Sequence, residues 1–479
     1  MVATYKSYNY FLLMSLNICW GTFLMGYFLI VYNPLQEEIE HQYNWKDPST
    51  RNTYEGLITA VIPLGAAVGS FFSSYGFKLL GRRKSCFVLD LLCIIGTGLT
   101  LIETLPCLLI GRLLCGMTVG VNSILVGLYI REICPLELSD VFGSFGNFTL
   151  NIGILVCFLL GLNCLSPEEL DAGEKNNWWR LMFGIPIVIC MIRSLFILIF
   201  FNYDSPIYLL SNNENDAAMI IIKNLYKPEH VQEIYENMSL RVDSLRKRKQ
   251  SLFLREIIDK RYSLRLFIGL SLVFANQFSG VNAISFYSTK LFLKLGWSNS
   301  VANGLNLGLG MVNILAGLVI TFPIRKIGVK YTYLISLFLV IITLSLISLF
   351  TLLDVNLPSV IFTVAYNFSY NLGCGPIIFM IIPQILPERL IGFVFIMNWI
   401  FAFAIGFCFP KMIDSSMGID GSFLFFACCV LAVFVFNIIF LKETGGKTNA
   451  EISTVYAKLN DYKEPFDNFT AGEEINNSN

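Results

Sequence analysis

Histidine and charge are scarce in this chain of 479 residues, which holds two histidines and only 14% charged residues. Its thirteen cysteines include no CxxC pair, so the sequence lacks the ligand spacing of a metal cluster. We therefore expect no metal site and no cofactor. The 34 basic residues equal the 34 acidic ones, and with no net charge we expect no nucleic-acid partner.

Apolar residues, by contrast, make up 55% of the chain, and the mean hydropathy is +0.63. Runs of about 20 mostly apolar residues, the length that crosses a bilayer, recur from Tyr10 to Leu441. The predicted spans are 10–32, 56–77, 87–106, 109–130, 141–163, 180–202, 264–294, 301–324, 332–353, 358–385, 392–412 and 421–441. The first run lacks a cleavage site and should act as a membrane anchor. The sequence thus predicts an all-α membrane protein with twelve transmembrane helices.

The charges of the short loops predict the orientation of these spans. Basic residues gather after spans 2 and 8, whereas the loops after spans 1 and 5 are acidic. The basic residues are Lys78, Arg82, Arg83, Lys84, Arg325, Lys326 and Lys330, and the acidic ones include Glu37, Glu38, Glu40, Glu55, Glu168 and Glu169. Because cytoplasmic loops carry an excess of Lys and Arg, both termini are predicted to be cytoplasmic. We expect a multi-pass protein of the plasma membrane.

The chain also reads as two similar halves joined by a hydrophilic segment. LLGRRKS after span 2 corresponds to IRKIGVK after span 8, and DSPIYLL after span 6 to KETGGKT after span 12, which suggests a duplication. Between the halves, NDAAMIIIKNLY and VQEIYENMSLRVDSLRKRK have the apolar spacing of helices with charged faces. The predicted units are a first six-helix bundle at 1–202, an intracellular helical linker at 203–262, a second six-helix bundle at 263–441, and a partly disordered cytoplasmic tail at 442–479.

Side-chain amides interrupt the apolar pattern of span 7. The stretch NQFSGVNAISFYST at 276–289 holds Asn276, Gln277 and Asn282 around Gly280. In hydrocarbon such groups need partners, so they should face the bundle interior or a water-filled cavity. A regular helix would keep Gln277 and Asn282 apart, and we expect a break at Gly280 that brings both onto one cavity wall. The alternative is that these amides only join neighbouring helices.

Further amides lie in spans 5, 8, 10 and 11. They are Asn147, Asn313, Asn371 and Asn398. None of these groups is charged, so the ligand they imply is neutral and rich in hydroxyls, which both donate and accept hydrogen bonds. Phe379 and Trp399 could supply the apolar face that such a ligand also needs. A hexose fits this description, and no histidine, cysteine or carboxylate group suggests an enzyme.

Taken together, these motifs resemble those of the facilitative glucose transporters, the sugar porters of the major facilitator superfamily. NQFSGVNAISFYST is similar to the family's QQLSGINxxxYYS, KETGGKTNAEI to its PETKGRTxxEI, and LGRRKS, GRLLCG and NLGCGPI to its loop after span 2 and its spans 4 and 10. The resemblance covers nearly the whole chain. It implies the major facilitator fold, two pseudo-symmetric six-helix bundles, and alternating access around one central site.

The resemblance also implies roles for particular residues. Sugar contacts are expected from Asn147, Asn276, Gln277, Asn282, Asn313, Asn371, Phe379, Asn398 and Trp399. Gate residues are expected at Phe286 and Tyr287 on the outer side and at Arg82, Arg83, Glu132 and Glu443 on the inner side.

Several positions depart from the family's pattern. Asn147 replaces its glutamine, Asn371 its glutamate and Phe379 its tryptophan, so the preferred sugar stays open. In the inner charge network, Ser139, Val329 and Gln384 stand at partner positions, and we expect the resting balance of the two gates to lean inward.

The expected activity is uniport of a hexose, most simply glucose. A proton symporter needs a titratable group in the pathway, and the proton-coupled relatives place an aspartate in span 1 where this chain has Phe28. Asp90 is the remaining intramembrane candidate, and we expect it to pair with nearby loop arginines.

Arg193, inside span 6, should contact backbone carbonyls or a cavity. The alternatives are a proton-coupled carrier, a polyol or organic-anion carrier in which Arg193 lines the cavity, and a non-transporting sugar receptor. No obligate protein partner is expected.

Overall fold

The computed structural model describes residues 5–45, 47–173, 177–248, 260–444, 452, 455 and 456. Helices make up almost all of this part of the chain. The first half contains α1 (Tyr8–Ile30), α2 (Gln36–Tyr43), α3 (Pro48–Thr100), α4 (Leu105–Ile133), α5 (Leu136–Gly161), α6 (Pro167–Asp171) and α7 (Trp178–Ile199). The second half contains α12 (Lys260–Phe278), α13 (Val281–Lys294), α14 (Asn299–Val319), α15 (Thr321–Ile327), α16 (Val329–Leu352), α17 (Asn356–Ser369), a π-helical turn η2 (Tyr370–Cys374), α18 (Ile378–Ile385), α19 (Glu388–Ile413) and α20 (Gly418–Phe440).

Every predicted span corresponds to a helix or a broken pair of helices. Among the described residues, ten helices are long and apolar enough to cross a membrane; α3, with 53 residues, accommodates two of the predicted spans, and α5 supplies a shorter apolar helix over 145–161. The predicted end of span 3 at 106 is wrong, because α3 ends at Thr100 and α4 already begins at Leu105. A proline lies in the first turn of α4. Backbone N–H groups in a first turn have no partner within the helix, so a proline, which lacks this group, favours a helix start here.

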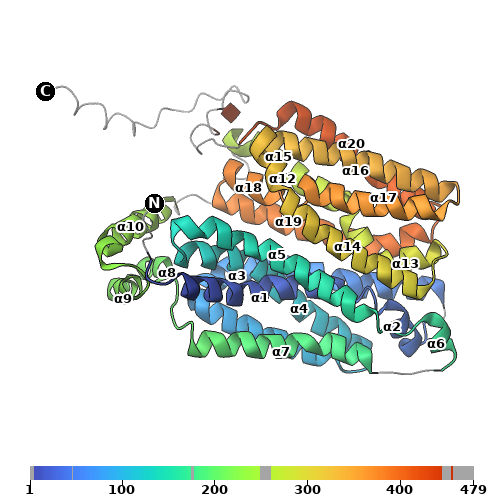
Figure 1. Ribbon diagram of the computed structural model, residues 1–479, viewed down its shortest axis with the longest axis horizontal. Coiled ribbons are helices and arrows are strands. Elements are labelled where there is room, and N and C mark those ends of the chain that lie inside the picture. Colours follow the sequence, from blue (N-terminus) through green and yellow to red (C-terminus); the bar gives the residue numbers. More distant parts are fainter. Residues whose placement is uncertain are drawn as a thin grey trace.

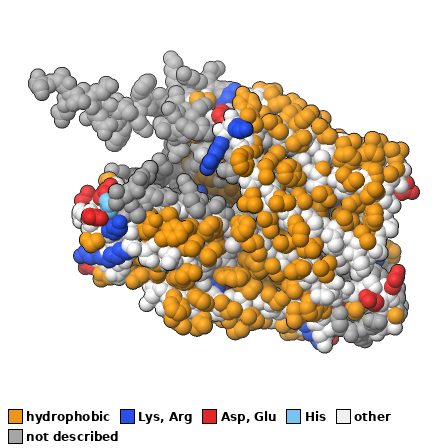
Figure 2. All heavy atoms as spheres, viewed as in Figure 1, with side chains coloured by type: hydrophobic (Ala, Val, Ile, Leu, Met, Phe, Trp, Pro, Cys, Tyr) orange, Lys and Arg blue, Asp and Glu red, His pale blue; other side chains and the backbone are white. Residues whose placement is uncertain are grey.

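The long helices form two groups that lie side by side, with the linker helices at one end (Figure 1). Apolar side chains cover much of the flank of the molecule, whereas most charged side chains gather at its two ends (Figure 2). Such a band of exposed apolar residues fits a lipid environment, where it is not a liability. We call the end with α8–α10 the linker end, and the end with α2 and α6 the α2 end.

The linker contains α8 (Pro206–Ser211), α9 (Asn215–Leu225), a 3₁₀ turn at Pro228–His230 and α10 (Val231–Arg248). Helices α9 and α10 coincide with the two amphipathic stretches predicted from the sequence. Their buried residues Ile222 and Val242 share one apolar core with Phe11 of α1 and Ile130 of α4. The described linker helices therefore pack as part of the first half. The boundaries at 202 and 263 stay a prediction, as does the state of the tail, most of which lies outside the described residues.

The two halves repeat one structural device at the linker end. Gly81 has a φ of +79° and breaks α3, and the backbone N–H groups of Arg82 and Arg83 donate to the Asp204 carboxylate (3.0 and 3.3 Å). Gly328 has a φ of +90°, and the N–H groups of Val329 and Lys330 donate to the Glu443 carboxylate (3.1 and 3.0 Å).

In each case a positive φ, which favours glycine, starts a new helix, and an acid from a distant segment caps its N-terminus. This geometry matches the sequence repeat between LLGRRKS and IRKIGVK.

Candidate functional site

Span 7 is broken at Gly280, as the sequence predicted. Gly280 has a φ of +83° and separates α12 from α13. A Cβ at this position would lie 2.8 Å from the ring of Phe426, so both the conformation and the packing require glycine. The break places the carboxamide of Asn282 against that of Gln277, to which it donates a hydrogen bond.

A chain of hydrogen-bonded side chains continues from Gln277 in two directions. Gln277 Nε2 donates to Asn398 Oδ1 (2.9 Å) on α19 and to Asn276 Oδ1 (3.1 Å). Asn276 Nδ2 in turn donates to the Tyr370 hydroxyl (2.8 Å) and the Cys374 carbonyl (3.2 Å). We call these five side chains, from Asn276, Gln277, Asn282, Asn398 and Tyr370, the amide chain. Its members come from three stretches of the sequence: 276–282, Tyr370 and Asn398.

A second amide pair lies between α14 and the π-helical turn. Asn371 Nδ2 donates to Asn313 Oδ1 (2.8 Å) and to the Asn367 carbonyl (2.9 Å). Both side chains are half-buried. Among the described residues, no hydrogen bond links this pair directly to the amide chain.

The remaining predicted sugar contacts lie apart from these two groups. Asn147 is exposed on α5, and Phe379 is 52% exposed, with its ring stacked on Phe395 at 5.2 Å between centroids. Trp399 is buried in an apolar cluster with Phe28 and Ile62, so it packs against the first half. The structure thus brings four of the nine predicted contacts into one chain and pairs two others.

Tyr370 is the residue of the amide chain that sequence reasoning missed. The local sequence around Tyr370 is typical of a buried aromatic residue. It does not indicate that the hydroxyl accepts a hydrogen bond from Asn276, 94 positions away. The available signal was its position next to Asn371 in a glycine-containing stretch. There the backbone forms a π-helical turn, in which Gly375 N–H donates to the Tyr370 carbonyl (3.0 Å), and such turns are frequent at functional sites.

The α2 end is closed by contacts between the two halves. Asn33 Nδ2 donates to the Ser285 carbonyl (2.6 Å) and the Ser288 hydroxyl (2.8 Å) of α13. Gln36 Nε2 donates to the Phe286 carbonyl (3.0 Å). Here the predicted outer-gate residues Phe286 and Tyr287 are both buried.

Within α13 the backbone is irregular at Tyr287 (φ −130°, ψ 16°). The Tyr287 hydroxyl donates to the Gly406 carbonyl (2.6 Å), which joins α13 to α19. Glu38 of α2 is also buried, and burial raises the pKa of its carboxyl to about 7.

At the linker end, the predicted inner-gate charges are satisfied within their own halves. Arg82 pairs with Glu132 (2.7 Å) inside the first half, and Glu443 caps α16 inside the second. The side chain of Ser139 lies outside what the structure describes, and Val329 is buried.

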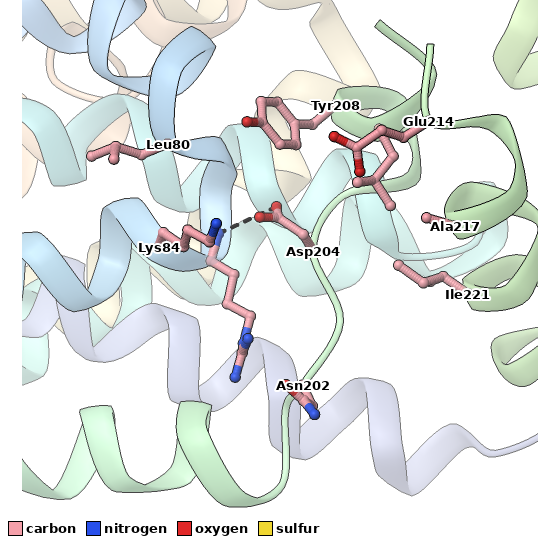
Figure 3. A pocket seen from close by; sticks show the side chains of 10 residues that line it. Leu80, Lys84, Asn202, Asp204, Tyr208, Glu214, Ala217 and Ile221 are labelled. Carbon is pink, nitrogen blue, oxygen red and sulfur yellow. Dashed lines mark hydrogen bonds between the residues drawn. The ribbon is translucent and has the colours of Figure 1, made fainter. Parts of the chain in front are cut away.

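A polar cavity of about 280 Å³ lies beside the capped break of α3, between that break and the linker (Figure 3). Arg83, Lys84, Asp204 and Glu214 contribute to its wall. Its charges are mixed, and it lies at the linker end rather than at the amide chain.

Asp90 and Arg193 form a buried ion pair. Arg193 Nε donates to Asp90 Oδ1 (2.8 Å), Ser194 donates to Asp90 Oδ2 (2.7 Å), and both charged side chains are 1% exposed. Arg193 Nη1 also lies 3.4 Å from Asn122 Oδ1. The expectation that Asp90 pairs with loop arginines was wrong, and so was the expectation that Arg193 contacts carbonyls or a cavity. Each neutralises the other inside the first half.

A family profile described as "Sugar (and other) transporter" matches residues 13–456. The chain belongs to this sugar transporter family. Such proteins are transporters and are not enzymes. The match therefore identifies a multi-pass membrane transporter, and the helices described above are consistent with the predicted twelve-span fold.

Relatives of this transporter cover nearly its whole length. It is 30% identical to "Plastidic glucose transporter 4" of Arabidopsis thaliana over 91% of this chain and 78% of that protein. It is 27% identical to "Solute carrier family 2, facilitated glucose transporter member 3" of Oryctolagus cuniculus over 91% and 90%. Among solved structures, the proton:xylose symporter XylE bound to 6-bromo-6-deoxy-D-glucose has a TM-score of 0.77 at 20% identity, covering 94% and 100%.

Proposed function

We propose that this sugar transporter is a uniporter for hexoses, with glucose as its principal substrate. The observation that carries the proposal is the amide chain, in which Gln277, Asn276, Asn282 and Asn398 offer uncharged donors and acceptors at one place between helices of the second half. Sugar hydroxyls can exchange with these groups one for one, because each hydroxyl both donates and accepts. Glucose and hexose transporters among the relatives support the choice of substrate.

Uniport is supported by the absence of a usable proton acceptor at this site. The amide chain contains no carboxylate, and Phe28, where proton-coupled relatives place an aspartate, is buried among apolar residues. The intramembrane carboxylate of Asp90 is held by Arg193, and proton binding would leave that guanidinium unpaired in a buried place. The Asp90–Arg193 pair therefore supports a structural role better than a coupling role.

The arrangement of the two ends supports alternating access. We propose that Asn313, Asn371, Asn147, Phe379 and Trp399 complete the sugar pathway on either side of the amide chain. Phe286 and Tyr287 act at the gate of the α2 end, and Arg82, Arg83, Glu132 and Glu443 stabilise the helix ends that surround the opposite gate. With the basic loops in the cytoplasm, the α2 end faces outward, both termini face the cytoplasm, and the outward gate is closed in the conformation described here.

Sugar binding should be weak. The amides already hydrogen-bond to each other, so a bound sugar replaces bonds rather than adding them, and each exchange gains little. A dissociation constant of about 1 mM corresponds to roughly 4 kcal/mol. Such affinity suits a carrier that must release its cargo.

The plasma membrane is the proposed location, with an organelle membrane as the second candidate. The second candidate is favoured by the two plastidic glucose transporters of Arabidopsis thaliana among the relatives.

Flux into liposomes that contain only the purified protein tests the proposal. We expect saturable uptake of D-glucose, no uptake of L-glucose, and the same initial rate with and without a pH gradient across the membrane. Protein-free liposomes set the background. A rate that requires an inward proton gradient, or alkalinisation of the medium when sugar is added, would contradict uniport. D-glucose that fails to compete with another transported hexose would contradict the choice of substrate.

A further inference from the structure

The first inference concerns Tyr370 and rests on the proposed sugar site. The carboxamide of Asn276 has one acceptor oxygen and two donor hydrogens. Both donors are used, by the Tyr370 hydroxyl and the Cys374 carbonyl, and the oxygen receives Gln277 Nε2. Asn276 is 4% exposed. Because its oxygen accepts from Gln277 Nε2, Asn276 is placed to orient the Gln277 carboxamide.

The orientation of the Asn276 carboxamide is fixed by the Cys374 carbonyl, which can accept a hydrogen bond but cannot donate one. The Cys374 carbonyl only accepts, so it selects the nitrogen of Asn276, and the Tyr370 hydroxyl receives the second hydrogen. The backbone at Cys374 is held in turn by Ser336, whose hydroxyl accepts from Cys374 N–H (2.8 Å) and donates to the Ser369 carbonyl (2.6 Å). The acceptor oxygen of Asn276 therefore faces Gln277.

We propose that Tyr370 is a positioning residue of the sugar site, which acts through Asn276 to hold the Gln277 carboxamide in its binding orientation. The phenol lies in the π-helical turn between α17 and α18, so it also links that turn to the broken helix of span 7. A phenylalanine would keep the ring and its packing while removing the acceptor.

Kinetics of Tyr370→Phe in liposomes test this role. We expect KM for D-glucose to rise about five-fold, the effect of one hydrogen bond, while the maximal rate stays within two-fold. In an Asn276→Ala background the same substitution should change KM no further, because the group through which Tyr370 acts is gone. Tyr333→Phe is the matched control, since the buried Tyr333 hydroxyl has no hydrogen-bond partner among the described residues, and it should leave KM unchanged.

An unchanged KM in Tyr370→Phe, or an equal rise in both backgrounds, would overturn the positioning role. These outcomes are separate from failure of the proposed function, which would appear as absent or proton-driven flux in the unmodified protein.

A second inference comes from the distribution of ion pairs and does not depend on the substrate. Lys290 of α13 pairs with Glu55 of α3, and the two side chains are 6% and 0% exposed. Glu55 Oε1 also lies 3.1 Å from Arg51 Nε, and Lys290 Nζ lies 3.4 Å from Asn52 Oδ1. Among the ion pairs of the described residues, this is the one that joins the first half to the second.

The opposite end is organised differently. There the carboxylates of Asp204, Glu132 and Glu443 accept hydrogen bonds from donors of their own half, as described above. At this end, no ion pair between two described residues joins the halves. Charge therefore contributes to closure at the α2 end, where uncharged contacts from Asn33 and Gln36 already hold α13.

We propose that the Glu55–Lys290 pair is a charge-matched latch of the α2 gate. A buried ion pair contributes little net stability over two hydrated ions, but a single buried charge without its partner is costly. Lys290 without Glu55 would be a buried ammonium without its carboxylate, whereas Glu55 without Lys290 still has Arg51 beside it. Closure is therefore disfavoured most when Lys290 is left without Glu55. Opening of the α2 end would hydrate the unpaired charge and relieve that cost.

Hydrogen–deuterium exchange of the full-length protein in detergent tests the latch without any sugar. In Glu55→Gln we expect about ten-fold faster exchange in peptides covering 36–43 and 281–294, which corresponds to opening of the α2 gate, and no acceleration in 206–225. Lys290→Met should accelerate exchange less, because Arg51 still lies beside Glu55. The neutral pair Glu55→Gln/Lys290→Met should return to the unmodified rate.

Arg180→Gln is the matched control, because it breaks the Arg180–Glu103 pair, which lies within the first half at the same end; it should not change these rates. Thermal unfolding of each variant separates gate opening from general destabilisation, which would accelerate exchange in all peptides alike. The latch is overturned if Glu55→Gln exchanges like the unmodified protein, if all peptides accelerate together, or if the neutral pair does not restore the slow rate.

Discussion

Arg193→Leu is expected to remove most of the folded transporter from the membrane. The substitution leaves the Asp90 carboxylate, 1% exposed, without its guanidinium. Breaking a buried pair from one side costs about 3–5 kcal/mol, a large part of the 5–15 kcal/mol that typically stabilises a folded protein. The measurement is the yield of monodisperse protein after solubilisation together with its thermal midpoint.

Removal of both charges should restore much of the loss. In Asp90→Asn/Arg193→Leu, no buried charge is left unpaired, and an asparagine can still accept a hydrogen bond from Ser194. We expect a thermal midpoint near that of the unmodified protein and D-glucose uptake within a few-fold. If Arg193→Leu instead folds normally and only transport is lost, Arg193 would be part of the substrate path and an anionic cargo would regain support.

Gln277→Leu should abolish measurable hexose transport while the protein still folds. This side chain is the branch point of the amide chain, with hydrogen bonds to Asn276, Asn398 and Asn282. Loss of the three bonds, at about 1 kcal/mol each, corresponds to roughly 100-fold in Vmax/KM. Leucine has a similar volume, so packing against the neighbouring helices is largely kept. Uptake into liposomes and the thermal shift caused by D-glucose measure the effect.

Asn437→Leu provides the comparison for that experiment. Asn437 is fully buried and hydrogen-bonds to Ser271 in the same half, outside the amide chain. Its replacement should lower the thermal midpoint and leave KM unchanged. A Gln277→Leu protein with normal KM would show that the amides only hold helices together.

Periodicity and composition predicted the parts of the fold that depend on local sequence. Apolar runs of bilayer length locate the spans, because hydrocarbon requires a continuous helix with satisfied backbone groups. Gly280 could be assigned to a break because an apolar helix with two amides five residues apart needs a change of direction to bring them together. The amphipathic linker helices follow from spacing alone.

Partners between distant helices could not be predicted in the same way. A pattern gives the depth of a residue in the membrane, but not the direction in which its side chain points. Asp90 lies nine residues after Gly81, about two and a half helical turns, and Arg193 lies six residues before Ile199, a little under two turns. This similar depth was the signal that could have paired them. Lys290 and Glu55 gave a weaker signal, because charges near a helix end usually contact water.

Irregular backbone is unevenly divided between the two halves. Within the described spans of the first half, the break at Gly81 lies at the capped linker end, and α1, α4, α5 and α7 keep regular helical geometry inside their bounds. The second half contains the left-handed Gly280, the irregular Tyr287 and the π-helical turn at Tyr370–Cys374. During a transport cycle the first half can therefore serve as a fixed platform, and the bending that admits and releases cargo falls to three short joints in the second half.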